Sequence, residues 1–328
     1  HSILEYACGS KYGGGMRARF STLTDDEIIE SFRNLQKPSS GLAEAGRSRH
    51  VLDFIYGVNL SRALAQSFKA GNRGYRNLSI GRVQGPALAF AADRELEIRL
   101  HVPDPYWVVT ADFEKNGQTI HARYKEPQVG TLAEAQKIVG DCAGRDGMVN
   151  NVDVRKVTLA PPAPFNTGEL QREAYRLFRV APGYALAIAE KLYLRALISY
   201  PRTASQKLPA SINYNKILSG LAGSASYSRH ASVLLSRDRL VPHEGPGTDP
   251  AHPAIYPTGL QGRLSGLEFK IYDLIVRRFL ATFGDTAAAE RTEVAIDMQG
   301  RTFIVEGRVT LYDGWMAFYR PYVNLEQS

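Results

Sequence analysis

The residues best suited to chemistry are Tyr200 and Arg202, in the stretch Leu197-Ile198-Ser199-Tyr200-Pro201-Arg202-Thr203-Ala204-Ser205-Gln206-Lys207-Leu208-Pro209. A phenol has a pKa near ~10 and is a poor nucleophile until it is positioned or deprotonated. If Tyr200 attacks phosphorus, the Arg202 guanidinium could stabilise the charge that spreads over the phosphoryl oxygens. The alternative is an ordinary surface turn, because a tyrosine and an arginine at this spacing often occur by chance.

A helix must present this tyrosine. The apolar residues Ala185, Ile188, Ala189 and Leu192 share one helical face, which predicts a buried helix that begins after Pro182. We expect Pro201 to end the helix, because the residue before a proline is disfavoured in the α region. A preceding helix is predicted from the capping box Asn166-x-x-Glu169 to Phe178.

Two further strings carry polar residues in loops. Leu78-Ser79-Ile80-Gly81-Arg82-Val83-Gln84-Gly85-Pro86-Ala87-Leu88 leads into a predicted helix, so Ser79, Arg82 and Gln84 would sit beside free backbone N–H groups that favour anions. Asp249-Pro250-Ala251-His252-Pro253-Ala254-Ile255-Tyr256-Pro257-Thr258 has three prolines and no periodicity, which predicts a loop. A lone histidine in a loop is usually only solvated, and the first string alone would be a generic loop-to-helix join.

Basic residues dominate residues 47–92, where Asp53 is the only acid. A solvated helix face usually mixes both signs of charge, so this stretch predicts a surface that follows a phosphate backbone. The basic residues are Arg47, Arg49, Arg62, Lys69, Arg73, Arg76 and Arg82.

Together the three strings resemble the signature segments of type IA DNA topoisomerases, and the Tyr-Pro-Arg form is most similar to the topoisomerase III-like branch. The resemblance implies that Tyr200 attacks one DNA strand, with Arg202 as the second catalytic residue. It places His252 at the active site, and we expect Thr203, Ser205 and Lys207 to support it. The implied DNA-binding residues are Arg47, Arg49, Asp53, Ser79, Arg82, Gln84, Arg73 and Arg76.

The order of elements predicts a multidomain protein of mixed α and β class. Alternating segments at 107–124 and 149–159 precede the tyrosine region, and another pair at 294–311 follows it. We expect both sets to share one sheet, because sheet edges seek partners. The predicted domains are a helical base (1–102), a β arch (103–160), a helical tyrosine domain (161–285), the second part of the arch (286–312) and a return to the base (313–328). This agrees with the ring-shaped architecture implied by the family.

Family members also carry an N-terminal Toprim domain, which supplies a glutamate for proton transfer and an acidic cluster for Mg²⁺. No such domain is recognisable in this sequence, so it is identified as a central piece with no metal ligands of its own. We therefore expect Mg²⁺ and a Toprim domain, in cis or as a separate chain, to be needed for cleavage. By itself the chain is expected to bind single-stranded DNA and to cleave it very slowly or not at all.

Composition narrows the class of protein. The chain has 328 residues and a net charge of +7, which favours a polyanionic partner. Two cysteines at no zinc-binding spacing, and no long apolar run, predict an intracellular protein, cytoplasmic or nucleoid-associated, with no membrane partner. No ATP motif is visible. A non-catalytic module that binds single-stranded DNA remains an alternative, whereas a tyrosine recombinase is disfavoured because Tyr200 precedes His252.

Overall fold

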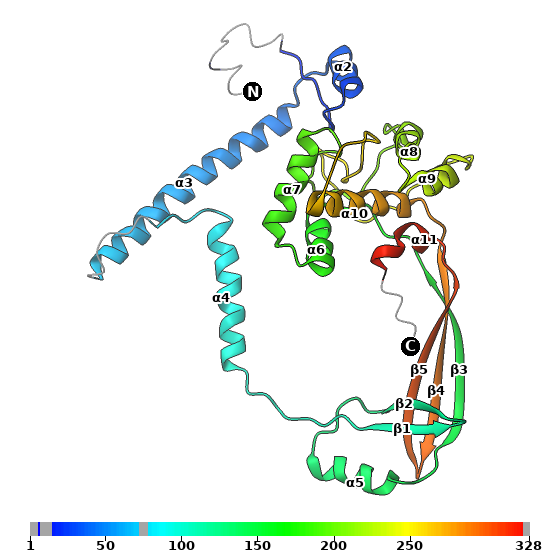
Figure 1. The fold of residues 1–328 in the computed structure, drawn as a ribbon. Coiled ribbons are helices and arrows are strands. Elements are labelled where there is room, and N and C mark those ends of the chain that lie inside the picture. Colours follow the sequence, from blue (N-terminus) through cyan, green and yellow to red (C-terminus); the bar gives the residue numbers. More distant parts are fainter. Residues whose placement is uncertain (1–5, 7–14, 72–77, 324–328) are drawn as a thin grey trace. The chain divides into compact units, whose positions relative to one another are not determined.

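The computed structural model describes Tyr6 and residues 15–71 and 78–323 (Figure 1). Arg73, Arg76 and Cys8 therefore lie outside the described residues. The chain divides into two compact units. The first unit comprises His1–Arg19 and Asn34–Pro105, and the second comprises Phe20–Arg33 and Tyr106–Ser328.

Two long helices make up most of the first unit's described residues. Helix α3 spans Ser40–Ala70, with the Ser39 hydroxyl capping its first turn, and helix α4 spans Gln84–Leu100. The loop before α4 is held to α3 because the amide of Ile80 donates to the Ser61 hydroxyl at 3.0 Å. Apolar side chains of both helices, such as Phe54 and Phe90, are exposed.

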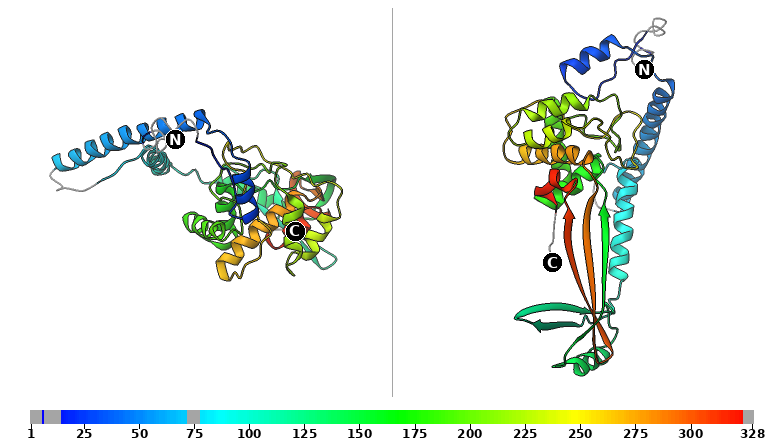
Figure 2. Two further views of the ribbon diagram at one scale, coloured as in Figure 1. Left: turned by 90° about the horizontal axis from the view of Figure 1, so that it is seen from above. Right: turned by 90° about the vertical axis from the view of Figure 1, so that its right-hand side faces the viewer.

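The second unit contains a five-stranded antiparallel sheet with strand order β1-β2-β5-β4-β3. Its strands are β1 (Thr110–Lys115), β2 (Gln118–Tyr124), β3 (Met148–Leu159), β4 (Ala287–Met298) and β5 (Arg301–Tyr312). Strands from both sides of the tyrosine region therefore share one sheet, as predicted. Strands β3, β4 and β5 run side by side away from the helical part, and the β1–β2 hairpin and helix α5 (Leu132–Cys142) lie at their far end (Figure 2).

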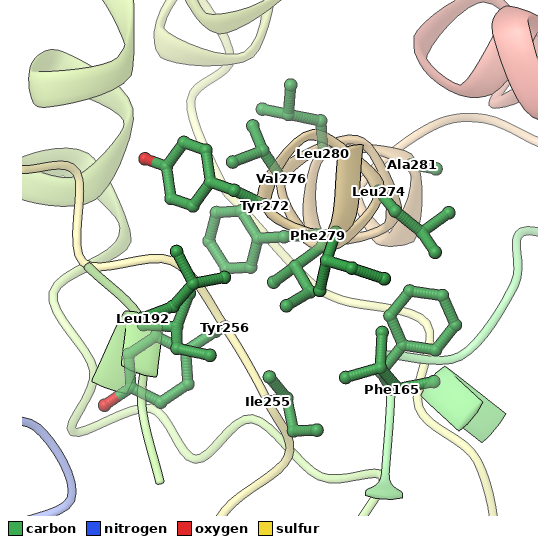
Figure 3. Close-up of a cluster of buried hydrophobic side chains, with 14 of the residues drawn as sticks. Phe165, Leu192, Ile255, Tyr256, Tyr272, Leu274, Val276, Phe279, Leu280 and Ala281 are labelled. Carbon is green, nitrogen blue, oxygen red and sulfur yellow. The ribbon is translucent and has the colours of Figure 1, made fainter. Parts of the chain in front are cut away.

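A helical part lies between β3 and β4 in the sequence. Its helices are α6 (Thr167–Phe178), α7 (Pro182–Leu194), α8 (Tyr214–Ala222), α9 (Ser228–Leu235) and α10 (Gly266–Thr282). Helix α2 (Asp25–Arg33) belongs to the same unit, as do α11 (Met316–Tyr319) and the short helix η2 (Arg320–Tyr322). The core forms around α10, with Leu192 and Tyr256 on one side of the cluster and Phe165 on another (Figure 3).

The mixed α and β class is confirmed, but two local predictions differ from the structure. Helix α7 ends at Leu194, well before Pro201, because Ala196 adopts a left-handed conformation (φ 57°). The amide of Leu197 then donates to the carbonyl of Leu192 at 3.0 Å, and the amide of Ala196 donates to the carbonyl of Tyr193 at 2.8 Å. These two hydrogen bonds form a Schellman motif at the end of the helix. Proline is therefore not what ends the helix.

The region between Pro209 and Gly247 is rich in Ser and Gly and has no clear periodic pattern, yet it contains α8 and α9. These helices are only 9 and 8 residues long, and each buries apolar residues in the core, among them Leu218 and Leu234. Tertiary packing rather than a long periodic pattern therefore stabilises them.

The C-terminal segment also lies elsewhere than predicted. Residues 313–328 were assigned to the helical base, but Phe318 and Tyr319 pack into the core around α10. Residues 20–33 likewise group with the tyrosine region rather than with α3. Within the described ranges, no helix has the length and apolar character needed to cross a membrane.

Candidate active site and nucleic-acid interface

Two motif segments that are distant in the sequence are joined by backbone hydrogen bonds. The amide of Ser199 donates to the carbonyl of Tyr256 at 2.9 Å, and the amide of Thr258 donates to the carbonyl of Leu197 at 3.0 Å. The buried Ser199 hydroxyl lies between the two segments, where it accepts from the amide of Tyr256 and donates to the carbonyl of Ala254. Two of the strings found in the sequence thus form one site.

The Tyr200 side chain lies between two rings. The Tyr193 ring, on α7, meets it edge-on with centroids 5.3 Å apart. On the other segment, the His252 ring lies 4.6 Å from it, tilted by 46°. Burial, followed by the proximity of Tyr200 and Glu27, raises the pKa of Tyr193. Tyr193 is therefore a neutral neighbour that fixes the Tyr200 ring.

The two hydroxyls after Tyr200 face inward and support the loop. Thr203 and Ser205 are 5% and 2% exposed. The Thr203 hydroxyl accepts from the amide of Ser205 at 3.0 Å, and the Ser205 hydroxyl accepts from the amide of Lys207 at 3.1 Å. From α6, the Thr167 hydroxyl donates to the carbonyl of Pro201 at 2.7 Å and accepts from the amide of Thr203 at 2.9 Å. These bonds hold the backbone that follows the tyrosine.

The two cations of the segment are each paired with a glutamate. The Nε of Arg202 donates to Glu190 of α7 at 2.5 Å, and this bond raises the pKa of Arg202. Lys207 lies 3.4 Å from the Glu244 carboxylate, which also accepts from the amide of Leu208 at 2.7 Å. Arg202 is the more exposed of the two cations, with 56% of its side chain accessible.

Asp249 shapes the loop that carries His252. Its carboxylate accepts from the amides of Ala251 at 2.8 Å, His252 at 3.0 Å and Ala204 at 3.3 Å. Burial opposes ionisation of Asp249, but the three amides outweigh it and lower the pKa of this carboxyl. The carbonyl of His252 in turn accepts from the Thr203 hydroxyl at 3.3 Å.

Sequence reasoning missed Glu27, at the start of α2. Its carboxylate accepts from the amide of Ser21 at 2.6 Å and the amide of Thr22 at 3.1 Å, and it also bonds the Thr22 hydroxyl. The carbonyl of Ser21 accepts from the amide of Tyr200 at 2.9 Å. Glu27 therefore anchors the segment that holds the backbone of the tyrosine. The Thr24-x-x-Glu27 spacing of a capping box was the available signal.

The predicted DNA-binding residues with described positions belong to the first unit. Arg82 donates to Asp53 of α3 through Nε at 2.5 Å, and Arg49 lies 3.7 Å from the same carboxylate. The Arg82 hydrogen bond lowers the pKa of Asp53. Arg47 lies 4.0 Å from Glu44, while Ser79 and Gln84 are exposed at the mouth of α4. The acid in this basic stretch therefore orients two arginines.

The chemistry supported by the tyrosine site is nucleophilic attack assisted by a cation and an imidazole. Among the described residues, no group of three or more His, Cys, Asp or Glu side chains could hold a metal ion. The described part of the chain therefore offers no set of side chains that fits Mg²⁺. The buried thiol of Cys142 lies at the far end of the sheet, where burial raises its pKa.

The chain is similar to known proteins over nearly its whole length. A topoisomerase I structure from Thermotoga maritima has 25% sequence identity to it and a TM-score of 0.73, covering 95% of this chain and 51% of that one. DNA topoisomerase 1 of Pyrococcus horikoshii is 43% identical over 331 residues, which cover 100% of this chain and 48% of that protein. DNA topoisomerase 3 of Schizosaccharomyces pombe is 30% identical over 95% of this chain and 51% of its own length.

The chain thus spans about half the length of the curated relatives it matches. The sequence profile of a family described as DNA topoisomerase matches residues 37–328. That match includes α3, the string before α4, Tyr200 and His252. The chain therefore belongs to the type IA DNA topoisomerase family.

Proposed function

We propose that this chain forms the core of an enzyme that cleaves and rejoins one DNA strand through Tyr200. The phenolic oxygen attacks a backbone phosphorus, a bond from tyrosine to the 5′-phosphate forms, and the bond from phosphorus to the 3′ oxygen breaks. The phenol loses its proton to a base, and the 3′ oxygen must gain one to leave as a hydroxyl. Attack by that hydroxyl reverses the step. The placement of Tyr200 against His252 at 4.6 Å carries this proposal.

Arg202 and His252 have complementary roles in the proposed reaction. Arg202 has a permanent charge and an exposed guanidinium, so it would stabilise the phosphoryl oxygens in the transition state. His252 would contact the phosphate when protonated or help to move a proton when neutral. Thr203, Ser205 and Lys207 would act indirectly, because two of them bond the loop backbone and the third is paired with Glu244.

The proposed substrate is single-stranded DNA. The basic face of the first unit, with Arg47, Arg49 and Arg82, would follow the phosphate backbone. Strand passage through the enzyme-bound break would then relax or decatenate DNA. The Tyr-Pro-Arg form of the nucleophile segment supports assignment to the topoisomerase III-like branch. A DNA substrate also supports a place in the cytoplasm at the nucleoid.

We further propose that a Toprim domain, in cis or as a separate chain, supplies Mg²⁺ and the acid that protonates the 3′ oxygen. The family resemblance supports this division of roles. General acid catalysis typically contributes ~10²–10⁴-fold. The chain alone should then bind single-stranded DNA and cleave it very slowly or not at all.

A second candidate function is a non-catalytic module that binds single-stranded DNA, favoured by the exposed arginines of the first unit. The discriminating experiment incubates end-labelled single-stranded DNA with the chain, with and without a Toprim domain and Mg²⁺, and separates the products under denaturing conditions. The proposed enzyme leaves a covalent adduct once the Toprim domain and Mg²⁺ are added. A chain that binds DNA but leaves no adduct under either condition is the binding module.

A further inference from the structure

One face of α7 contacts both predicted catalytic side chains. Glu190 and Tyr193 are three residues apart on this helix, so they project from the same face. Tyr193 packs edge-on against Tyr200, and Glu190 accepts from Arg202. Because Tyr200 and Arg202 follow α7 in an irregular segment, this face determines where both side chains lie.

The Glu190 bond occupies only one side of the Arg202 guanidinium. A guanidinium has five N–H groups in a fixed plane, one on Nε and two on each terminal nitrogen. Glu190 takes the Nε donor at 2.5 Å. Neither Nη1 nor Nη2 of Arg202 is bonded to any residue that the structure describes. More than half of the Arg202 side chain is exposed, so a ligand from solution can reach the guanidinium.

We infer that Glu190 is a positioning residue for Arg202: it fixes the guanidinium through Nε so that Nη1 and Nη2 meet the phosphate that Tyr200 attacks. The phosphate would then bind end-on to the two terminal nitrogens rather than side-on through Nε. The inference rests on the proposed function, because Arg202 must meet a phosphate for its orientation to matter.

The competing role for Glu190 is an anion that the phosphate displaces from Arg202. Exposed ion pairs are worth only ~0.2–1 kcal/mol, so such an exchange would be possible on energy alone. The geometry favours positioning, because a competitor would need to cover the phosphate-binding nitrogens, and Glu190 bonds only Nε. The two roles predict opposite effects on DNA binding when the carboxylate is removed.

The test compares Glu190→Gln and Glu190→Ala with the parent chain in the presence of a Toprim domain and Mg²⁺. Glutamine keeps a hydrogen-bond acceptor of the same length, whereas alanine removes it. With single-stranded DNA in excess, we expect the adduct to form roughly 10- to 100-fold more slowly in Glu190→Ala, because misplaced catalytic groups lose about this much. The Glu190→Gln rate should fall between the two, and the affinity for DNA should stay within about twofold of the parent.

The matched control is Glu268→Ala, which removes a carboxylate of similar exposure (35% against 37% for Glu190) that pairs with Arg195 at the end of α7. Its adduct rate should equal that of the parent. Equal rates in Glu190→Ala and the parent would overturn the inference. So would tighter DNA binding in both Glu190 variants, which is the behaviour of a displaced competitor.

A nitrogen-15 NMR measurement of Arg202 Nε separates this inference from the proposed function. In the parent chain the Nε–H proton should be protected from exchange with water, and in Glu190→Ala this protection should be lost. Identical Nε–H exchange in the two proteins would overturn positioning even if the adduct forms. A parent chain that forms no adduct would refute the proposed function, while the NMR comparison would still decide whether Glu190 holds Arg202.

Discussion

At the scale of single residues, the two side chains proposed to be catalytic, Tyr200 and Arg202, are fixed by different means. Tyr200 is held through its amide, which donates to Ser21, and through the rings of Tyr193 and His252. Arg202 is held by one charged hydrogen bond to Glu190. The proposed nucleophile is thus restrained by packing, whereas the proposed catalytic cation keeps both terminal nitrogens unbonded among the described residues.

The Tyr193 ring contact should contribute to catalysis without any role for its hydroxyl. An aromatic pair is worth about 0.5–1.5 kcal/mol beyond burial, so Tyr193→Leu should slow adduct formation by roughly 2- to 13-fold. Tyr193→Phe keeps the ring 5.3 Å from Tyr200 and should match the parent rate. Single-turnover kinetics on labelled DNA measure both variants. An equal loss in the two variants would show that the hydroxyl, not the ring, matters.

Asp249 should stabilise the His252 loop in a pH-dependent manner. Folding lowers the pKa of the Asp249 carboxyl. The ionised carboxylate therefore contributes its full stabilisation of the fold at a pH above the unfolded-state pKa, which is near ~3.9. This stabilisation is lost as the pH falls through the folded-state pKa. In urea denaturation, Asp249→Asn should lose on the order of 1 kcal/mol of unfolding free energy at neutral pH. The difference from the parent should shrink as the pH falls below about 4. A difference independent of pH would exclude this ionisation as its cause.

At the scale of elements, α7 is the helix that positions the site, and its C-terminal end sets the start of the nucleophile segment. Its buried face of Ala185, Ile188, Ala189 and Leu192 was predictable, because these residues recur with helical spacing. Its end was not, because alanine gives no sign that it will adopt a left-handed conformation, where glycine is usual.

Replacing Ala196 with glycine should stabilise the fold. An alanine in the left-handed region costs ~1–2 kcal/mol, and glycine removes this cost. Glycine also destabilises the folded state by ~0.5–1 kcal/mol, because it raises the conformational entropy of the unfolded chain. Ala196→Gly should therefore raise the unfolding free energy by up to about 1 kcal/mol, measured by urea or thermal denaturation. Ala189→Gly on the buried face of the same helix is the control and should destabilise it. Destabilisation by both substitutions would contradict the Schellman assignment.

Helix α2 is the second element that holds the site, through Glu27. Hydrogen bonds to a charged group are worth about 1.5–3 kcal/mol, so Glu27→Ala should lower the unfolding free energy by that amount. Asp25→Ala on the same helix should change it by less than about 1 kcal/mol, because Asp25 acts only through the helix dipole. Equal losses in the two variants, measured by urea denaturation, would show that Glu27 does not anchor Ser21 and Thr22.

At the scale of the whole molecule, sequence patterns predicted those features of the fold that depend on residues close together in the sequence. The capping box Asn166-x-x-Glu169 located the start of α6, whose first turn the Asn166 side chain caps. The shared sheet of strands from both sides of the tyrosine region was also predicted, since sheet edges seek partners, but which strand pairs with which was not. The Arg202–Glu190 and Ser21–Tyr200 contacts could not be predicted, because they depend on how helices pack in three dimensions.

The basic face of the first unit should determine how DNA binding depends on salt. Arg49 is exposed on α3, with 72% of its side chain accessible. Arg49→Ala should weaken single-stranded DNA binding and flatten the plot of log affinity against log salt by about one unit. The control is Arg291→Ala, an arginine paired with Glu306 on the sheet, which should leave the slope unchanged. An unchanged slope in Arg49→Ala would exclude a phosphate contact at this residue.

The most direct test of the account asks which residue becomes attached to DNA. With a Toprim domain and Mg²⁺, labelled single-stranded DNA should yield an adduct on a denaturing gel, and peptide mass spectrometry should place the phosphate on Tyr200. Tyr200→Phe should abolish the adduct and leave DNA affinity nearly unchanged, because only one hydroxyl is removed. An adduct that persists in Tyr200→Phe, or maps to another residue, would contradict the assignment of Tyr200 as the nucleophile.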